Sequence, residues 1–336
     1  TNNGAISLSY AILGSNVSGS GTLAVNSGNN SLQGTNSYSG TTTINAGAVL
    51  KIGEFNAQTT GSVGTAAVVN NGGLTFYRSG SLTVANDISG SGSLTNAGTG
   101  TITLLGNNSY TGGTSLTAGT LVLGSSTALG PSGTITLSGG GLKYSASNTA
   151  DYSARFNLAN NTTVTVDTAG QNVTWSSALN TATGTSLVKN GSGTLLLSGA
   201  NQWQGLSSPA TRGLTINAGT LELSGSSITV GNGITNNGTL TFNSSSAISI
   251  GSRISGSGVL IKSGTGDLTL SSGNDYYGGT RILAGNLIAN GTSGTILPTL
   301  GSIGTISFEG GTLKYTSATN DINDYSSRFS TAANQA

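Results

Sequence analysis

Short runs of alternating apolar and polar residues cover most of the chain. Clear examples lie at 74–76, 82–84, 101–104, 134–137 and 163–166. A period of two over three to six residues predicts β-strands, and the Thr and Val that fill these runs suit a pleated surface. Asn-Gly or Gly-Ser-Gly separates many of the runs and predicts tight turns. No stretch has a helical period, so the pattern predicts an all-β protein.

A nine-residue motif recurs along the chain. Its clearest copy, Gly-Asn-Asn-Ser-Tyr-Thr-Gly-Gly-Thr, occupies 106–114 and is followed by Ala-Gly-Thr-Leu at 118–121. Variants occupy 34–42, 199–203 and 273–280, and the Ala-Gly pair that follows each of them begins at Ala46, Ala218 and Ala284. Such recurrence indicates a repeat architecture in which each copy is one structural unit.

A longer period contains the short one. Residues 70–76 match 236–242 with an offset of 166, and 142–144 match 313–315 with an offset of 171. The sequence therefore contains nearly two copies of a unit of about 170 residues, each with two smaller repeats. We expect residues 1–336 to be one continuous β-helix fragment that is cut at both ends and belongs to a longer array.

A solenoid explains these periods better than a sandwich or a barrel, because it adds rungs without limit and each rung buries a face of its neighbour. With three short strands to a turn, a rung takes about 20 to 25 residues. The sequence predicts a right-handed parallel β-helix of roughly 15 rungs. The longer interval between Ala118 and Ala218 predicts an added rung and an inserted loop near 207–209.

Composition narrows the classes of partner. Charged residues make up 6% of the chain and hydrophobic residues 35%, so a core can form although the surface carries little charge. The net charge of +1 and the scattered Lys and Arg give no basic patch for nucleic acid. No cysteine is present to form a disulfide. No apolar run reaches the roughly 20 residues of a spanning helix, so we expect no membrane insertion by this segment, and residues 1–18 lack a signal-peptide pattern.

The motif resembles the passenger-associated transport repeat of bacterial autotransporters. The resemblance rests on 107–114 with Ala118 to Gly124, and on 187–201, which reads Leu-Val-Lys-Asn-Gly-Ser-Gly-Thr-Leu-Leu-Leu-Ser-Gly-Ala-Asn. It implies a β-helical stalk that is exported across the outer membrane of a Gram-negative bacterium and often serves adhesion or self-association. The sequence contains no translocating barrel of the kind such proteins carry, which leaves the export route open.

Aromatic residues occupy the same place in all four copies of the motif: Tyr38, Tyr110, Trp203 and Tyr276. Exposed rings in a row could stack on the sugars of a glycan. The favoured interpretation is structural, with each ring packed over a Gly-rich turn such as Gly112-Gly113, because every copy keeps the ring.

A second repeated element, Asp-Tyr-Ser-x-Arg-Phe, begins at Asp151 and again at Asp324. In an extended strand, alternation places Asp151 and Arg155 on one face and the aromatic residues on the other. The same holds for Asp324 and Arg328. We therefore expect two outward ion pairs, each contributing about 0–1 kcal/mol to stability.

Catalysis and metal binding find little support in the sequence. Histidine is absent and only 10 acidic residues are spread along the chain, whereas glycan cleavage needs clustered carboxylates. The Gly-Gly-x-Gly-x-Asp nonapeptide of calcium-binding β-rolls does not occur. We expect no catalytic residues, no cofactor and no array of metal sites.

The leading hypothesis is therefore a non-catalytic, extracellular or cell-surface stalk that presents itself to a cell-surface or glycan ligand, or that self-associates. Two alternatives stay open. One is a subunit of a secreted filament or surface layer, and the other is a β-helix that binds or cleaves carbohydrate.

Overall fold

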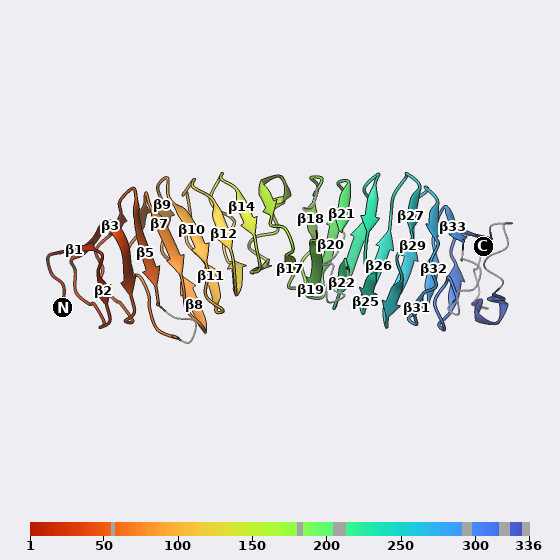
Figure 1. Ribbon diagram of the computed structural model, residues 1–336, viewed down its shortest axis with the longest axis horizontal. Coiled ribbons are helices and arrows are strands. Elements are labelled where there is room, and N and C mark those ends of the chain that lie inside the picture. Colours follow the sequence, from red (N-terminus) through yellow and green to blue (C-terminus); the bar gives the residue numbers. More distant parts are fainter. Residues whose placement is uncertain (55–57, 180–183, 204–212, 291–297, 316–322, 331–336) are drawn as a thin grey trace. The chain divides into compact units, whose positions relative to one another are not determined.

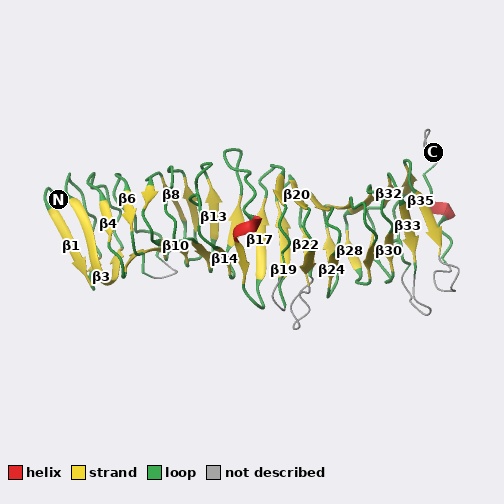
Figure 2. Ribbon diagram, turned by 90° about the horizontal axis from the view of Figure 1, so that it is seen from above, coloured by secondary structure: helices red, strands yellow, loops and turns green. Residues whose placement is uncertain are grey.

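The computed structural model describes the chain except for residues 55–57, 180–183, 204–212, 291–297, 316–322 and 331–336. The loop predicted near 207–209 lies outside the described residues. The described part is almost entirely β, with two single-turn 3₁₀ helices, η1 (Ser153–Arg155) and η2 (Ser326–Arg328). Figure 2 shows short yellow strands joined by green turns, with helix confined to these two places.

Two compact units make up the chain. The first comprises residues 1–150 and 155–158, and the second comprises 151–154 and 159–336. The continuity of the solenoid over 1–336 stays a prediction.

In the first unit, strands of successive turns lie side by side in three parallel sheets (Figure 1). One sheet contains β1 (Ala5–Ser9), the first part of β3 (Thr22–Leu32), β4 (Thr42–Ile44), β6 (Val68–Asn70) and β9 (Ile88–Ser89). The next contains β2 (Ile12–Leu13), the second part of β3, β5 (Ala48–Ile52), β7 (Gly73–Phe76), β10 (Ser93–Asn96), β12 (Thr114–Leu116), β14 (Ile135–Leu137) and β16 (Phe156–Leu158). The last contains β8 (Ser81–Val84), β11 (Thr101–Leu104), β13 (Thr120–Leu123) and β15 (Gly141–Lys143).

The second unit repeats this arrangement. Its first sheet contains β17 (Thr163–Asp167), β19 (Ser186–Asn190), β22 (Leu214–Ile216), β25 (Ile234–Asn236), β28 (Ile254–Gly256) and β31 (Asp275–Tyr276). Its second contains β18 (Val173–Trp175), β20 (Thr194–Leu197), β23 (Thr220–Leu223), β26 (Thr239–Phe242), β29 (Val259–Lys262), β32 (Thr280–Ile282) and β34 (Ile306–Phe308). The remaining strands are β21 (Asn201–Trp203) with β24 (Ile228–Val230), and β27 (Ile248–Ile250), β30 (Leu268–Leu270), β33 (Asn286–Ala289) and β35 (Thr312–Tyr315).

The register of the sheets stacks like residues on like residues. Leu50, Leu74 and Leu94 are paired in successive strands, and all three have no exposed surface. Burying one such side chain stabilises the fold by about 1.5–3 kcal/mol, so each rung contributes a layer to a continuous core. The strands make about 13 turns, close to the roughly 15 predicted. The prediction of an all-β parallel solenoid is confirmed, and its right hand stays a prediction.

Candidate functional site

The motif aromatics are inside the solenoid. The side chains of Tyr38, Tyr110, Trp203 and Tyr276 have no exposed surface. Each tyrosine is hydrogen-bonded through its hydroxyl to the threonine four residues later, with O···O distances of 2.6 Å to Thr42, 2.7 Å to Thr114 and 2.7 Å to Thr280. In this arrangement the rings lie out of reach of a glycan.

Glycine of the following rung fits closely over the motif tyrosine. A Cβ on Gly301 would lie 2.3 Å from the carbonyl oxygen of Tyr276, and a Cβ on Gly64 would lie 2.6 Å from the ring of Tyr38. The glycines that were expected to make room, Gly112 and Gly113, instead approach backbone atoms of neighbouring rungs. The stacking of backbone on backbone therefore requires glycine there.

Burial also raises the pKa of the motif tyrosines. Desolvation raises the pKa of Tyr276 to about 12, although its bond with Thr280 and the charge of Arg328 act in the opposite direction. The pKa of Tyr38 is raised by burial in the same way. Both hydroxyls are therefore neutral hydrogen-bonding groups of the core at physiological pH.

The third copy departs from the tyrosine–threonine pair. Leu214 stands where the threonine would be, at the same distance before the Ala-Gly pair. The Nε1 of Trp203 is buried and has no hydrogen-bond partner among the residues that the structure describes. The third copy therefore lacks the hydroxyl pair of the other three.

A second motif residue, which the sequence interpretation left without a role, joins three rungs. The asparagine of Gly-x-Asn-x-Tyr is at most 6% exposed in every copy. In the second copy, Asn108 Oδ1 accepts the backbone N–H of Ile88 at 2.9 Å, and its Nδ2 donates to the carbonyl of Ala128, also at 2.9 Å. Those two partners lie 20 residues before and 20 residues after it.

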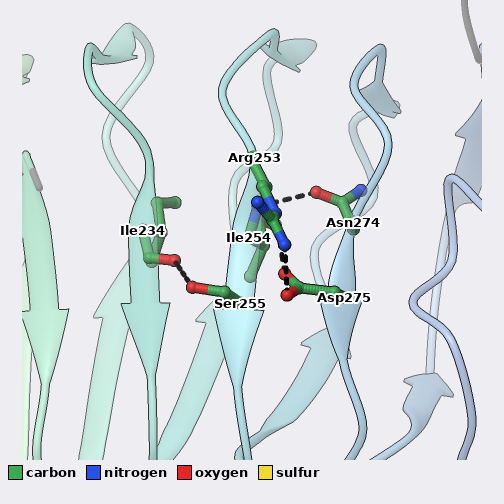
Figure 3. Close-up of polar contacts among 6 residues, drawn as sticks. All are labelled: Ile234, Arg253, Ile254, Ser255, Asn274 and Asp275. Carbon is green, nitrogen blue, oxygen red and sulfur yellow. Dashed lines mark hydrogen bonds and ion pairs between the residues drawn. The ribbon is translucent and has the colours of Figure 1, made fainter. Parts of the chain in front are cut away.

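The other copies accept a backbone N–H of the preceding rung in the same way. The backbone N–H of Val17 donates to Asn36 at 2.8 Å, that of Leu179 to Asn201 at 3.1 Å, and that of Ile254 to Asn274 at 2.7 Å. Figure 3 shows the last of them, between β28 and the start of β31. On the other side, Asn36 donates to Ser62 at 2.6 Å and Asn274 to Thr299. The motif asparagine thus hydrogen-bonds to backbone that parallel strand pairing leaves unsatisfied at the corners.

Two lysines are buried in the same manner. Lys189 has no exposed surface, and its ammonium donates to the carbonyls of Asn190, Gly191 and Ala218 at 2.9, 2.8 and 3.2 Å. Burial lowers the pKa of Lys189 to about 8, against the opposing charge of Asp167. Lys262 donates to the carbonyl of Ala284 at 3.0 Å and to that of Gly264. In both copies, the ammonium binds the alanine of the Ala-Gly pair one rung on.

Comparison with known families gives a match for this pattern. The model described as the passenger-associated-transport-repeat matches residues 17–50, 94–123, 187–223 and 260–289. These four segments are passenger-associated transport repeats. Two of them lie in each compact unit. No curated protein and no solved structure matches the chain.

The Asp-Tyr-Ser-x-Arg-Phe element lies outside the passenger-associated transport repeats, and the prediction that it is an extended strand is wrong. Its serine, x and arginine form η1 in the first copy and η2 in the second. The aspartate at the start of the turn accepts a hydrogen bond from the backbone N–H of the serine two residues later. The distance is 2.8 Å between Ser153 and Asp151 and 2.9 Å between Ser326 and Asp324. A helical turn removes the alternation on which the ion-pair prediction depended.

The arginine of this element binds carbonyl oxygens. Arg155 donates to the carbonyls of Leu129, Gly130 and Gly133 at 2.8, 2.9 and 2.8 Å, and also to that of Ser132. Arg328 does the same with Leu300, Gly301, Ile303 and Gly304, at 2.9, 2.8, 3.0 and 2.8 Å. Each guanidinium therefore fixes the loop that contains the glycine packed on the motif tyrosine.

The aspartates bind serines. Asp151 accepts bonds from the N–H and hydroxyl of both Ser153 and Ser176, and these bonds outweigh desolvation and lower its pKa. Hydrogen bonds from Ser326 lower the pKa of Asp324. The expected outward pairs, Asp151 with Arg155 and Asp324 with Arg328, are replaced by these contacts because the helical turn satisfies each side chain separately.

Ion pairs occur elsewhere, on the surface of the second unit. Arg253 donates to Asp275 at 2.9 Å through Nε and again through Nη2, and Arg281 donates to Glu309 at 2.8 and 2.6 Å. No group of three His, Cys, Asp or Glu side chains that could hold a metal occurs among the described residues. Over the same part of the chain, no helix has the length and apolar character needed to cross a bilayer.

Proposed function

We propose that the chain is a non-catalytic stalk of a surface-displayed protein of a Gram-negative bacterium and that it serves adhesion. The passenger-associated transport repeats and the β-solenoid fit a passenger of the autotransporter type. The observation that carries the proposal is the use of the motif's polar side chains. Asn108 and its equivalents bond from rung to rung inside the solenoid, so these side chains of the motif contribute cohesion between rungs.

Stiffness follows from the same contacts. An array held only by strand pairing can open at its corners, whereas here each repeat adds a side-chain bridge at a corner. A structure that resists local opening suits a stalk that carries load outside the cell. Adhesion would then occur on the outward side chains or through contact with another copy of the chain.

Surface labelling tests the location. Antibodies against the chain should bind intact cells of the bacterium that encodes it, and external protease should remove the signal. Labelling that requires permeabilised cells would contradict display at the surface.

A deletion strain tests adhesion. Cells that lack the gene should attach less to surfaces or to one another, and the full-length gene should restore attachment. Equal attachment with and without the gene would leave a stalk with no adhesive role.

A further inference from the structure

The fourth repeat carries a second, outward tyrosine directly after its motif aromatic. The residue after the motif aromatic is Ser39, Thr111 and Gln204 in the first three copies and Tyr277 in the fourth. The residue before the aromatic is serine or glutamine in three copies and Asp275 in the fourth. The motif tyrosine and asparagine are buried in the first, second and fourth copies alike, so the difference at Tyr277 concerns the face that is presented to solvent.

Two exposed apolar side chains lie on neighbouring rungs, and we refer to them together as the strip. Tyr277 is 52% exposed and Ile303 is 60% exposed. They lie on successive rungs, because a Cβ on Gly304 would be only 2.7 Å from the carbonyl oxygen of Tyr277. Arg328 holds the carbonyl of Ile303 at 3.0 Å, which fixes the loop on which this side chain stands.

The strands before and after Tyr277 each contribute one member of an ion pair. Asp275 lies on β31, two residues before Tyr277, and pairs with Arg253, which reaches across from the rung before, as Figure 3 shows. Arg281 follows on β32 and pairs with Glu309. Glu309 also accepts the hydroxyl of Ser307 at 2.9 Å, and the bonds from Arg281 and Ser307 lower its pKa to about 2. These charged groups are held in place by their partners, yet all four side chains are 30–46% exposed.

The backbone beside the strip is glycine. A Cβ on Gly278 would lie 2.5 Å from Gly258, and a Cβ on Gly258 would lie 2.3 Å from the carbonyl of Gly238. In the first unit, the equivalent column of Gly72, Gly92 and Gly112 lines a shallow groove of about 450 Å³. In the second unit, the column is formed by Gly238, Gly258 and Gly278, and Tyr277 directly precedes the last of these.

We propose that the surface formed by Tyr277, Ile303 and the two flanking ion pairs binds a neutral oligosaccharide. The strip is apolar along its centre and polar along both sides, which matches a sugar ring with its C–H face and its hydroxyl edges. The four charges sum to zero, so the surface does not select a polyanion. Rungs are about 4.8 Å apart, close to the length of one sugar residue, so an extended glycan could place successive rings on successive rungs.

A protein partner fits this surface less well. A stable protein interface buries about 800 Å² on each side, which is far more than the side chains of Tyr277 and Ile303 provide. The residues that follow the motif aromatic in the other repeats are Ser, Thr and Gln, which are not the aromatic and arginine side chains that dominate protein interfaces. The inference rests on the proposed adhesive function and names the chemical class of its ligand.

The test uses the whole chain and neutral hexasaccharides of glucose and N-acetylglucosamine, with heparin as the anionic comparison. Saturation-transfer NMR and calorimetry should detect at least one neutral hexasaccharide with a Kd of about 1 mM or lower. Tyr277→Thr restores the residue of the second copy and should weaken binding at least tenfold. Leu105→Ser removes an exposed apolar side chain of the first unit and should leave binding unchanged.

Four results would overturn the inference: no neutral hexasaccharide binds, only heparin binds, Tyr277→Thr binds as well as the wild type, or Leu105→Ser weakens binding equally. Analytical ultracentrifugation adds a fifth, because self-association that Tyr277→Thr abolishes would show the strip to be a contact between copies. Failure here is distinguishable from failure of the proposed function. If cells with Tyr277→Thr still attach but the chain binds no sugar, the stalk adheres through another surface.

Discussion

The hydroxyl of Tyr110 lies 2.7 Å from that of Thr114, and both side chains are buried within one corner of the solenoid. The same pair recurs in two other repeats at the same spacing. This relationship makes the motif aromatic a structural residue whose hydroxyl contributes to stability.

Replacing Tyr110 with Phe should therefore lower the free energy of unfolding by about 1 kcal/mol, because Thr114 loses its hydrogen-bond partner while the ring still fills the core. Urea unfolding followed by circular dichroism measures the change. Tyr277→Phe, at an exposed ring, is the matched control and should have no measurable effect. Equal effects of the two substitutions would contradict the assignment.

The raised pKa of Tyr276 predicts a loss of stability in alkali. The folded chain keeps this proton up to about pH 12, whereas an unfolded tyrosine releases it near 10.0. The folded state thus binds more protons between these values, and its stability should fall as the pH rises from 10 to 12. Urea midpoints across this range should decline less steeply in Tyr276→Phe. An unchanged slope would show that another group causes the decline.

Loss of the asparagine bridge should be more damaging than loss of the tyrosine hydroxyl. Asn108→Ala leaves the N–H of Ile88 and the carbonyl of Ala128 buried without this partner, at a cost of about 2–4 kcal/mol. Asn107→Ala changes the exposed neighbour and should cost little. Hydrogen exchange at Ile88 provides a local readout and should accelerate only in Asn108→Ala.

The arginine of the second element needs its planar shape. Arg155→Lys keeps the charge, but an ammonium cannot reach four carbonyls at once, so we expect a loss of about 2 kcal/mol. Arg281→Lys alters an exposed ion pair and should cost about 0–1 kcal/mol. If the two substitutions lowered the free energy of unfolding equally, the four carbonyl contacts of Arg155 would stabilise the fold no more than an exposed ion pair does.

Asn96 offers a stabilising substitution. It occupies the place of Lys262 in the repeat, stacked between Phe76 and Leu116, and neither its Oδ1 nor its Nδ2 has a partner among the described residues. In Asn96→Lys, the ammonium can donate to the carbonyls of Gly98 and Ala118, as Lys262 does at Gly264 and Ala284. We expect a gain of about 1 kcal/mol in the free energy of unfolding. A lower free energy of unfolding would mean that the rung at Asn96 cannot accommodate the longer lysine side chain.

Local pattern was sufficient for the strands and their order. Alternation at Leu74 to Phe76 and at Thr101 to Leu104 is a property of neighbouring residues, and the repeat spacing relates one rung to the next, so parallel stacking could be predicted. The passenger-associated transport repeat was recognisable for the same reason, since its residues lie within about 30 positions of one another.

Side-chain contacts between rungs could not be predicted from the local pattern. Asn108 meets its partners 20 residues away in each direction, and nothing local distinguishes it from the exposed Asn107. The strand predicted at Asp151 failed because Ser176, one rung on, helps to bind the aspartate while carbonyls of another rung bind Arg155.

The sequence by itself thus determined that the chain contains four passenger-associated transport repeats in parallel β-solenoid structure, because the period of a repeat can be read directly from the order of the residues. Only the tertiary structure decided which polar groups are enclosed and which are presented. It placed Tyr276, the last residue of β31, inside and Tyr277, directly after the strand, outside, because the core lies on one side of the backbone alone. That division separates the residues that hold the rungs together from those available to a ligand.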